Sequence, residues 1–276
     1  MEPLCYFNGE MLPESKAKIS VHDLGILRGF GIYQALRTVG QTPFMFAQHM
    51  ARFRSSARAM TLTIPATDTE IAEIIKKLIA HNIPSNQEAR IKLVLTGGES
   101  LGGIELGPTP TFYVLVDVFS PLPVEVYEKG CSLIMHECQR AFAENKTTNY
   151  AQAVMLQAER KKADALEILY TSHGLVLECS MSNIFFVKNG SVITPKQNIL
   201  EGVTRSLVIE LAKKEFPFAE RDIPIEEIFS ADEAYITATF KNIVPVVEIG
   251  GKKIGSGVPG PVTRRLMDLL DERLRG

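Results

Sequence analysis

The sequence predicts an α+β fold of two domains, a smaller N-terminal α/β domain and a larger strand-rich C-terminal domain. Three observations support this prediction. Short apolar runs between turn signals open the chain, amphipathic helical spacing follows, and Pro121-Leu122-Pro123 interrupts regular structure before a second set of strands begins. With 276 residues, 45% of them hydrophobic, the chain can bury more than one core. We expect a first domain over 1–120, a linker over 121–128 and a second domain over 129–276.

The first 46 residues carry the signals of β-hairpins. Phe7-Asn8-Gly9-Glu10 and Val39-Gly40-Gln41-Thr42 place turn-forming residues between apolar runs. Apolar residues then recur every three or four positions from Phe46 to Met60 and again from Ile71 to Ile79, which predicts two amphipathic helices. Two apolar runs after the helices predict buried strands, at Ile91–Leu95 and Phe112–Val118.

Strand signals dominate the second domain. The expected strands cover Ser132–His136, Glu167–Thr171, Leu175–Glu178, Asn183–Val187, Ser191–Thr194, Ala234–Thr237 and Val244–Ile249. The expected helices cover Tyr150–Lys162, Gly202 to about Phe216, and Pro261–Arg273. Because the strands cluster instead of alternating regularly with helices, the pattern favours an α+β architecture.

The charge balance favours a small-molecule partner. Thirty basic and thirty-two acidic side chains leave a formal net charge of −2 and a pI near 6.3. Such a chain has no net field that attracts nucleic acid or an anionic membrane surface. We therefore expect neither partner.

The cysteines and the N-terminal segment favour a cytoplasmic protein. The four cysteines lack the spacing of metal ligands and of a disulfide scaffold, so we expect reduced thiols and no metal. No segment has the length and apolar character of a signal peptide or a membrane span, so we expect neither.

Three polar segments could carry chemistry. Lys146 lies in the polar loop Glu144-Asn145-Lys146-Thr147-Thr148-Asn149-Tyr150, where an isolated lysine is ordinarily a solvated surface charge. Glu178 ends an apolar strand and is followed by the small polar run Cys179-Ser180-Met181-Ser182-Asn183. Gly202-Val203-Thr204-Arg205 opens a helix, whose free N–H groups can bind phosphate, although an ordinary N-cap is the simpler interpretation.

In this order and spacing the segments resemble the class IV aminotransferases, the fold-type IV family of pyridoxal-phosphate enzymes. That family includes D-amino acid aminotransferase, branched-chain aminotransferase and aminodeoxychorismate lyase. The resemblance extends from Asp23-Leu24-Gly25 to Pro261-Val262-Thr263-Arg264. It is strongest in Leu177-Glu178-Cys179-Ser180-Met181-Ser182-Asn183-Ile184-Phe185 and in Ile199-Leu200-Glu201-Gly202-Val203-Thr204-Arg205.

The resemblance implies a catalytic lysine and pyridoxal 5'-phosphate as the cofactor. Lys146 matches the family's lysine, which carries the cofactor as a Schiff base and moves the substrate Cα proton as general base and acid. Glu178 matches the carboxylate beside the pyridine nitrogen, which keeps the ring an electron sink. Tyr150, one residue out of register, resembles the tyrosine near the phenolic oxygen of branched-chain enzymes.

The remaining cofactor contacts are implied in the same way. Arg52, in His49-Met50-Ala51-Arg52, matches the phosphate-binding arginine, whose planar fork suits a dianion. Thr239 matches a second hydroxyl donor and Leu200 an apolar residue on the ring. The full set of expected cofactor residues is Arg52, Lys146, Tyr150, Glu178, Ser182, Asn183, Leu200, Gly202, Val203, Thr204, Ala238 and Thr239.

Substrate choice depends on how the substrate carboxylates are bound. The usual carboxylate trap of D-amino acid enzymes is replaced here by Thr96-Gly97-Gly98-Glu99. Arg28, on a loop that in this family reaches the partner subunit's site, and Arg90 could instead pair with an acidic substrate, which favours a D-amino acid aminotransferase using 2-oxoglutarate or pyruvate. The alternative is that both are ordinary surface residues. The expected substrate residues are Arg28, Tyr33, Arg90, Met181 and Phe240.

Several alternatives stay open. Branched-chain aminotransferase is favoured by Asn149-Tyr150 and by Lys92, which stands near a family arginine, whereas no feature selects aminodeoxychorismate lyase. A hydrolase using Ser180 or Ser182 lacks a recognisable histidine motif. A non-catalytic relative would lack the lysine, glutamate or arginine that this chain has. The resemblance further implies a two-fold homodimer.

Overall fold

The computed structural model describes residues 2–275, which form two compact units. Unit 1 comprises the residues up to Ser120 together with Asn145–Tyr150, and unit 2 comprises Pro121–Glu144 and the residues from Ala151 onward. The segment that contains Lys146 therefore belongs to unit 1 although the preceding strand belongs to unit 2.

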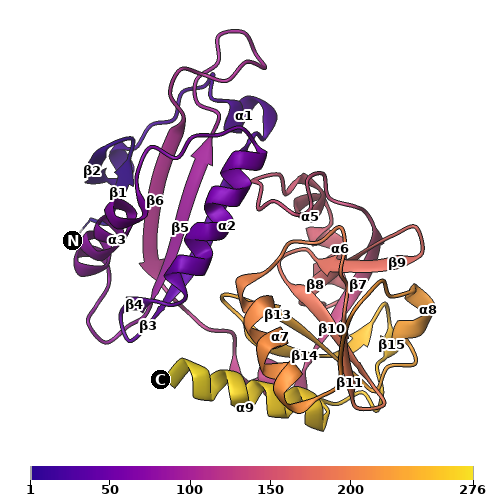
Figure 1. Ribbon diagram of the computed structural model, residues 1–276. Coiled ribbons are helices and arrows are strands. Elements are labelled where there is room, and N and C mark those ends of the chain that lie inside the picture. The colour runs from indigo at the N-terminus through magenta and orange to yellow at the C-terminus, as the bar shows by residue number, and fades with distance from the viewer. Residues whose placement is uncertain (1, 276) are drawn as a thin grey trace. The chain divides into compact units, whose positions relative to one another are not determined.

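Unit 1 is built on a six-stranded antiparallel sheet with the order β2-β1-β6-β5-β3-β4 (Figure 1). Both predicted hairpins are confirmed, because Asn8-Gly9 and Gly40-Gln41 turn the chain with positive φ at each residue. The strands are β1 (Leu4–Phe7), β2 (Glu10–Pro13), β3 (Gly31–Val39), β4 (Thr42–Pro43), β5 (Ala89–Thr96) and β6 (Thr111–Val118).

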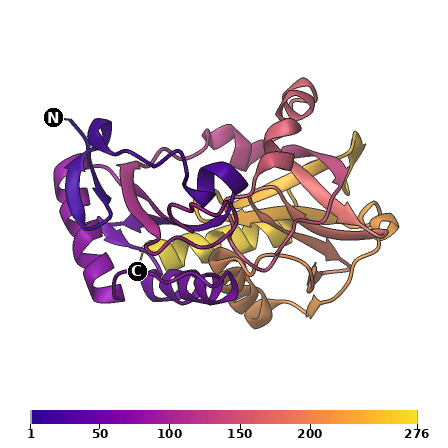
Figure 2. The ribbon, with the colours of Figure 1, turned by 90° about the horizontal axis from the view of Figure 1, so that it is seen from above.

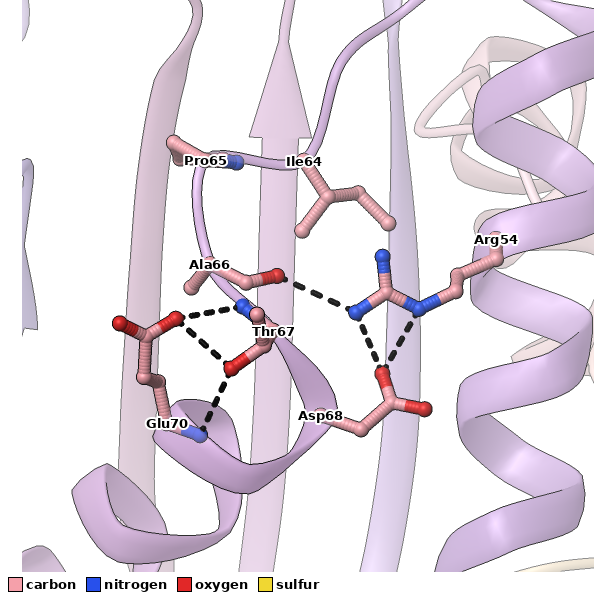
Figure 3. A pocket seen from close by; sticks show the side chains of 7 residues that line it. All are labelled: Arg54, Ile64, Pro65, Ala66, Thr67, Asp68 and Glu70. Atoms are coloured by element: carbon pink, nitrogen blue, oxygen red, sulfur yellow. Dashed lines mark hydrogen bonds and ion pairs between the residues drawn. The ribbon is translucent and has the colours of Figure 1, made fainter.

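Two helices pack on this sheet, as the apolar spacing predicts. Helix α2 (Phe46–Ala59) packs on β3, and α3 (Asp68–Asn82) packs on β1 and β6. Ile71, Ile75 and Leu78 give α3 its fully buried face. Its first turn is fixed by a capping box between Thr67 and Glu70, and Arg54 of α2 pairs with Asp68 beside it (Figure 3).

A short helix, α1 (Leu24–Arg28), is not predicted by the sequence pattern. The buried Asp23 carboxylate caps it by accepting from the Gly25 N–H at 2.6 Å, and Gly29 ends it in the left-handed conformation. Thr96 and Thr111 also donate to Asp23, at 2.9 and 2.5 Å. The helix therefore depends on residues far along the chain. A single 3-10 turn, η1 (Glu14–Lys16), follows β2.

Unit 2 is built on a nine-stranded mixed sheet. Its order is β12-β11-β10-β13-β14-β7-β8-β9, with β15 paired to β14. All seven predicted strands are present, and the short β12 and β15 are additional. The strands are β7 (Cys131–Glu137), β8 (Glu167–Ser172), β9 (Leu175–Cys179), β10 (Asn183–Lys188), β11 (Ser191–Thr194), β12 (Phe218–Glu220), β13 (Glu233–Ala238), β14 (Asn242–Ile249) and β15 (Lys252–Lys253).

Six helices accompany the strands of unit 2 in the described residues. Helices α7 and α9 pack on β13 and on each other, and α9 also runs along β14 (Figures 1 and 2). The predicted helix over Tyr150–Lys162 is instead two short helices, because Leu156 leaves helical geometry. Residues of the predicted linker form α4. The helices are α4 (Val124–Lys129), α5 (Ala151–Met155), α6 (Gln157–Lys162), α7 (Val203–Glu215), α8 (Ile225–Ile228) and α9 (Pro261–Arg275).

Within residues 2–275, no helix is both long enough and apolar enough to cross a membrane.

Candidate functional site

Lys146 lies beside the start of β3, held there by its backbone. Its carbonyl accepts from the Tyr33 N–H at 2.9 Å, and its N–H donates to Ser56 Oγ at 3.3 Å. The half-buried side chain places Nζ 4.6 Å from the centre of the Tyr33 ring, within range of a cation–π interaction. The predicted catalytic lysine is therefore presented by a fixed backbone segment against an aromatic wall.

Two tyrosines flank this lysine. The hydroxyls of Tyr33 and Tyr150 are 2.6 Å apart, and their rings meet edge to face with centroids 5.8 Å apart. Unit 1 thus brings together three predicted residues, Lys146, Tyr33 and Tyr150. The linked hydroxyls can donate to or accept from an oxygen placed beside the lysine.

Arg52 projects from α2 and is oriented by a buried amide. Its Nη2 donates to Gln34 Oε1 at 2.6 Å, while Gln34 Nε2 donates to the carbonyl of His49 at 2.5 Å. Gln34 is fully buried on β3. Because the partner is a neutral amide and not a carboxylate, the positive charge of the guanidinium is not cancelled by this contact.

His49 adds a buried imidazole to this cluster. It is 2% exposed, and its Nδ1 is buried without a hydrogen-bond partner. Burial, followed by the nearby Arg52 and Lys146 charges, holds the pKa of His49 well below its ordinary value. His49 is therefore neutral in the folded protein at neutral pH.

This shift predicts an acid-sensitive fold. Below about pH 6.5 the unfolded chain gains a proton at His49 that the folded chain does not bind, so stability falls by up to about 1.4 kcal/mol for each pH unit. Thermal unfolding of wild type and His49→Asn near neutral pH and about one unit below pH 6.5 checks this. We expect the variant to show a smaller loss on acidification than wild type, whereas exposed His173→Asn should behave as wild type. An equal loss in all three proteins would contradict the assignment.

In unit 2, Glu178 is a buried carboxylate surrounded by donors. Arg140 donates to Oε1 through Nε at 3.0 Å and Nη2 at 2.5 Å. The Leu200 N–H donates to Oε2 at 3.1 Å, and Asn183 Nδ2 lies 3.5 Å from the same oxygen. The side chain of Glu178 is 6% exposed and that of Arg140 is 14% exposed. These contacts favour the ionised carboxylate.

Asn183 holds the segment that leads into α7. Its Nδ2 donates to the Leu200 carbonyl at 2.7 Å, and a Cβ on Gly202 would lie 2.2 Å from its Oδ1. Only glycine fits there. Gly202 caps α7 without any side-chain hydrogen bond, so the N–H groups of Val203 and Thr204 have no capping side chain. Together with the helix dipole, these two N–H groups can bind an anion at the start of α7.

The other predicted residues of unit 2 lie in two turns. Met181 and Ser182 lie between β9 and β10, where Met181 is 59% exposed and Ser182 is buried. Ala238 ends β13, and Thr239 and Phe240 form the turn to β14, all half-buried. Both Ser180 and Ser182 donate to the carboxylate of Glu167. The hydrolase alternative therefore has a carboxylate, not a histidine, beside its candidate nucleophiles.

Arg28 does not lie on a loop, contrary to the expectation from the sequence. It is the last residue of α1, exposed, with Nη1 donating to the Leu27 carbonyl at 2.8 Å. The expectation is wrong because the Asp23 cap and Gly29 close a helical turn there.

Arg90 lies inside β5 and pairs with Asp117 at 3.1 Å, both side chains about 40% exposed. In the sheet Arg90 stands opposite Arg37 of β3. Arg37 is four residues from Tyr33, so Arg90 lies roughly 13 Å along the strand direction from Tyr33. The structure does not bring Arg90 to Lys146.

Several residues of these clusters were missed in the sequence. Arg140 and Glu178 are separated by 38 positions and meet only because the sheet folds, and Gln34 and His49 carried no motif of their own. Thr237 was also missed, although its buried hydroxyl has no hydrogen-bond partner and it stands opposite Asn183 in the sheet. Both Gln34 and Thr237 are polar residues in otherwise apolar strands, and this pattern is the sequence signal that could have indicated them.

A pocket of about 460 Å³ elsewhere in unit 1 contains none of the predicted residues (Figure 3). Its polar groups satisfy one another, since Arg54 donates to Asp68 and to the Ala66 carbonyl. We assign no function to it.

Comparisons with known proteins agree on one family. The family described as Amino-transferase class IV matches residues 31–249. A protein of Methanocaldococcus jannaschii, provisionally named as a branched-chain-amino-acid aminotransferase, is 33% identical over 95% of this chain and 93% of its own length. A D-alanine aminotransferase of Bacillus licheniformis is 28% identical over 97% and 96%.

Solved structures share the fold. The Escherichia coli branched-chain amino acid aminotransferase superposes with a TM-score of 0.90 at 24% identity, covering 99% of this chain and 94% of the other. A second branched-chain amino acid aminotransferase, from T.th. and solved with pyridoxamine 5'-phosphate, gives 0.89 at 26% identity, with 99% and 94% covered. Nearly the whole chain therefore has the two-domain architecture of fold type IV. This protein belongs to the class IV aminotransferases, whose cofactor is pyridoxal 5'-phosphate.

Proposed function

We propose that this aminotransferase moves amino groups from L-amino acids with branched aliphatic side chains to a 2-keto acid such as 2-oxoglutarate. The observation that carries the proposal is the 2.6 Å contact between the Tyr33 and Tyr150 hydroxyls beside Lys146. Tyr150 resembles, one residue out of register, the tyrosine that branched-chain enzymes place near the cofactor's phenolic oxygen. The 33% identical relative, named for the same substrates, supports this choice.

The residues present fit pyridoxal phosphate, with one set in each unit. Arg52 in unit 1 and the uncapped start of α7 in unit 2 are suited to a phosphate dianion. The partnerless hydroxyl of Thr237 lies on the strand that leads to Thr239. Glu178 offers an anionic oxygen suited to a protonated ring nitrogen.

The chemistry of the residues follows from these contacts. The bound cofactor supplies an electron-poor ring that accepts the electron pair left when the substrate Cα loses its proton. As a neutral amine, Lys146 Nζ would remove that proton, and the ammonium so formed would deliver it to the adjacent carbon of the cofactor. Glu178, stabilised as a carboxylate by Arg140, keeps the ring nitrogen protonated. The hydroxyls of Tyr33 and Tyr150 would orient the phenolic oxygen of the cofactor beside Lys146.

A D-amino acid aminotransferase remains the second candidate, favoured by the 28% identical D-alanine aminotransferase. The two-arginine argument for it now depends on Arg28 alone, because Arg90 is paired with Asp117. Arg28 is exposed at the end of α1, on a segment that in this family reaches the partner subunit's site.

Stereochemical preference is tested by mixing the purified protein with single amino donors and following the visible absorbance of the cofactor. We expect L-leucine, L-isoleucine and L-glutamate to change the spectrum, and D-alanine and D-glutamate to react at least about tenfold more slowly, a difference of about 1.4 kcal/mol. Reaction with the D-amino acids alone would establish the second candidate instead.

We further propose a two-fold homodimer that acts in the cytoplasm. Exposed apolar side chains of α1 and of the segment after β5 support an interface, namely Ile26, Leu27, Leu101, Ile104 and Leu106. The free thiols of Cys5, Cys131, Cys138 and Cys179 suit a reducing compartment. Sedimentation equilibrium tests the assembly, and a monomer at micromolar concentration would exclude it.

A further inference from the structure

A buried ion pair joins the two turns of unit 2 that carry predicted ligand contacts. Glu167, on β8, has a side chain only 3% exposed and pairs with Lys241 Nζ, whose side chain is 12% exposed. The Glu167 carboxylate also accepts from the Met181 N–H at 2.8 Å, from Ser180 Oγ at 3.3 Å and from Ser182 Oγ. One carboxylate thus binds the whole β9–β10 turn and a lysine from elsewhere.

Lys241 lies in the β13–β14 turn and stabilises it. Its N–H donates to the Ala238 carbonyl at 3.1 Å, which closes the turn over Thr239 and Phe240. Its Nζ also lies 3.5 Å from Ser182 Oγ. The ion pair therefore sets the spacing between the turn of Met181 and the turn of Thr239 and Phe240.

Holding the sheet together does not require this pair. Strands β10 and β13 already align the two turns by backbone pairing, with Asn183 opposite Thr237. Burying two charges costs solvation, so apolar side chains would serve stability as well or better. A buried pair is instead useful where a single geometry must be selected.

We propose that the Glu167–Lys241 pair is a positioning device, which fixes the two turns relative to each other so that Met181 and Phe240 meet the substrate and Thr239 meets the cofactor phosphate. The inference rests on the proposed function, because those three contacts belong to it. Glu167 and Lys241 themselves act only through the turns they hold.

The titratable groups around Glu167 leave Lys241 as its counter-charge. Cys131 on β7 and Cys179 on β9 face it as neutral thiols, because burial first and the Glu167 charge second raise the pKa of Cys131 to about 12 and that of Cys179 well above its ordinary value. Glu178, also on β9, is a like charge near Cys179 and is neutralised by Arg140. Among the groups described around Glu167, Lys241 supplies the closest positive charge.

Removal of Lys241 should therefore produce a pH-dependent defect in binding. In Lys241→Met holoenzyme the buried Glu167 carboxylate loses its counter-charge and is tolerated only when protonated, so the turns are disturbed more at high pH. At about pH 8 we expect KM for the amino donor and the dissociation constant of pyridoxal phosphate to rise at least about tenfold, with kcat changed less than about threefold. The rise should shrink as the pH is lowered toward about 5.5.

Two variants isolate the pair. Glu167→Gln combined with Lys241→Met removes both charges and with them the pair, so KM should stay above wild type, at the level that Lys241→Met reaches near about pH 5.5, without the pH dependence. Lys214→Met makes the same chemical change in the exposed pair with Glu210, where both side chains are 63% exposed, and should leave KM and kcat unchanged. The proposal would be overturned if Lys241→Met had a lower melting temperature with an unchanged KM, or if the rise in KM of Lys241→Met were independent of pH.

Hydrogen exchange of the apo-protein separates this inference from the proposed function. The amides of residues 180–183 and 238–242 should exchange faster in Lys241→Met than in wild type or Lys214→Met. Unchanged exchange in both segments would show that the pair does not hold the turns. A protein that turns over no amino donor would instead remove the proposed function, while the exchange result still decides whether the pair couples the turns.

Discussion

Lys146→Ala is expected to lower transamination at least about 10⁴-fold while leaving unit 1 folded. The loss is large because one amine both tethers the cofactor and moves the Cα proton, so no other group can take over either task. The fold is expected to survive because the backbone makes the contacts that place residue 146. The Lys146 carbonyl accepts from Tyr33 and its N–H donates to Ser56, and alanine keeps both.

Borohydride reduction followed by peptide mass spectrometry measures the tether directly. In wild type the cofactor should become fixed to the peptide that contains Lys146, whereas in Lys146→Ala no peptide should carry it. Lys77→Ala, an exposed lysine of α3, is the control and should behave as wild type in turnover, labelling and melting temperature. Appreciable turnover by Lys146→Ala, or a label on another lysine in wild type, would overturn the assignment.

The parts of the fold that follow from local pattern were predictable from the sequence. The Asn8-Gly9 and Gly40-Gln41 hairpins and the buried face of α3 each depend on neighbours a few residues apart. Helix α1 was missed because its cap is completed by Thr96 and Thr111, more than 70 positions away. A helix of five residues has too little periodicity to be recognised without that tertiary support.

The site divides in the same way. Motifs in sequence order located Lys146, Glu178 and the start of α7. The ion pairs around these residues could not be predicted, because their partners are far apart in the sequence and come together only through the strand order of the sheet. Lys241 and Glu167, 74 positions apart, are an example. Arg90 shows the converse, since it stands at the start of the predicted Ile91–Leu95 strand but its pairing with Asp117 depends on the β5–β6 register.

Glu178→Gln is expected to reduce kcat roughly 10²- to 10³-fold, the effect of removing one preorganised electrostatic group from a buried site. The amide is nearly the same size but carries no charge, so it cannot hold the ring nitrogen in its protonated form. Its NH₂ group must also face a donor, since Arg140 occupies one side of the carboxylate and the Leu200 N–H the other. One buried donor is then left without an acceptor, which should cost about 1–3 kcal/mol of stability.

Steady-state kinetics and thermal unfolding of Glu178→Gln separate the two effects. Arg140→Met removes the cation but leaves the carboxylate and its contact with the Leu200 N–H, so it should destabilise unit 2 by about 3 kcal/mol and lower kcat less than Glu178→Gln does. Glu210→Gln, at an exposed glutamate of α7, should change neither quantity. If Arg140→Met lowered kcat as much as Glu178→Gln while the cofactor stayed bound, the ion pair as a unit, and not the carboxylate alone, would control the ring nitrogen. If Glu178→Gln kept full kcat, the carboxylate would have only a structural role, and the electron sink would have to be maintained by another group.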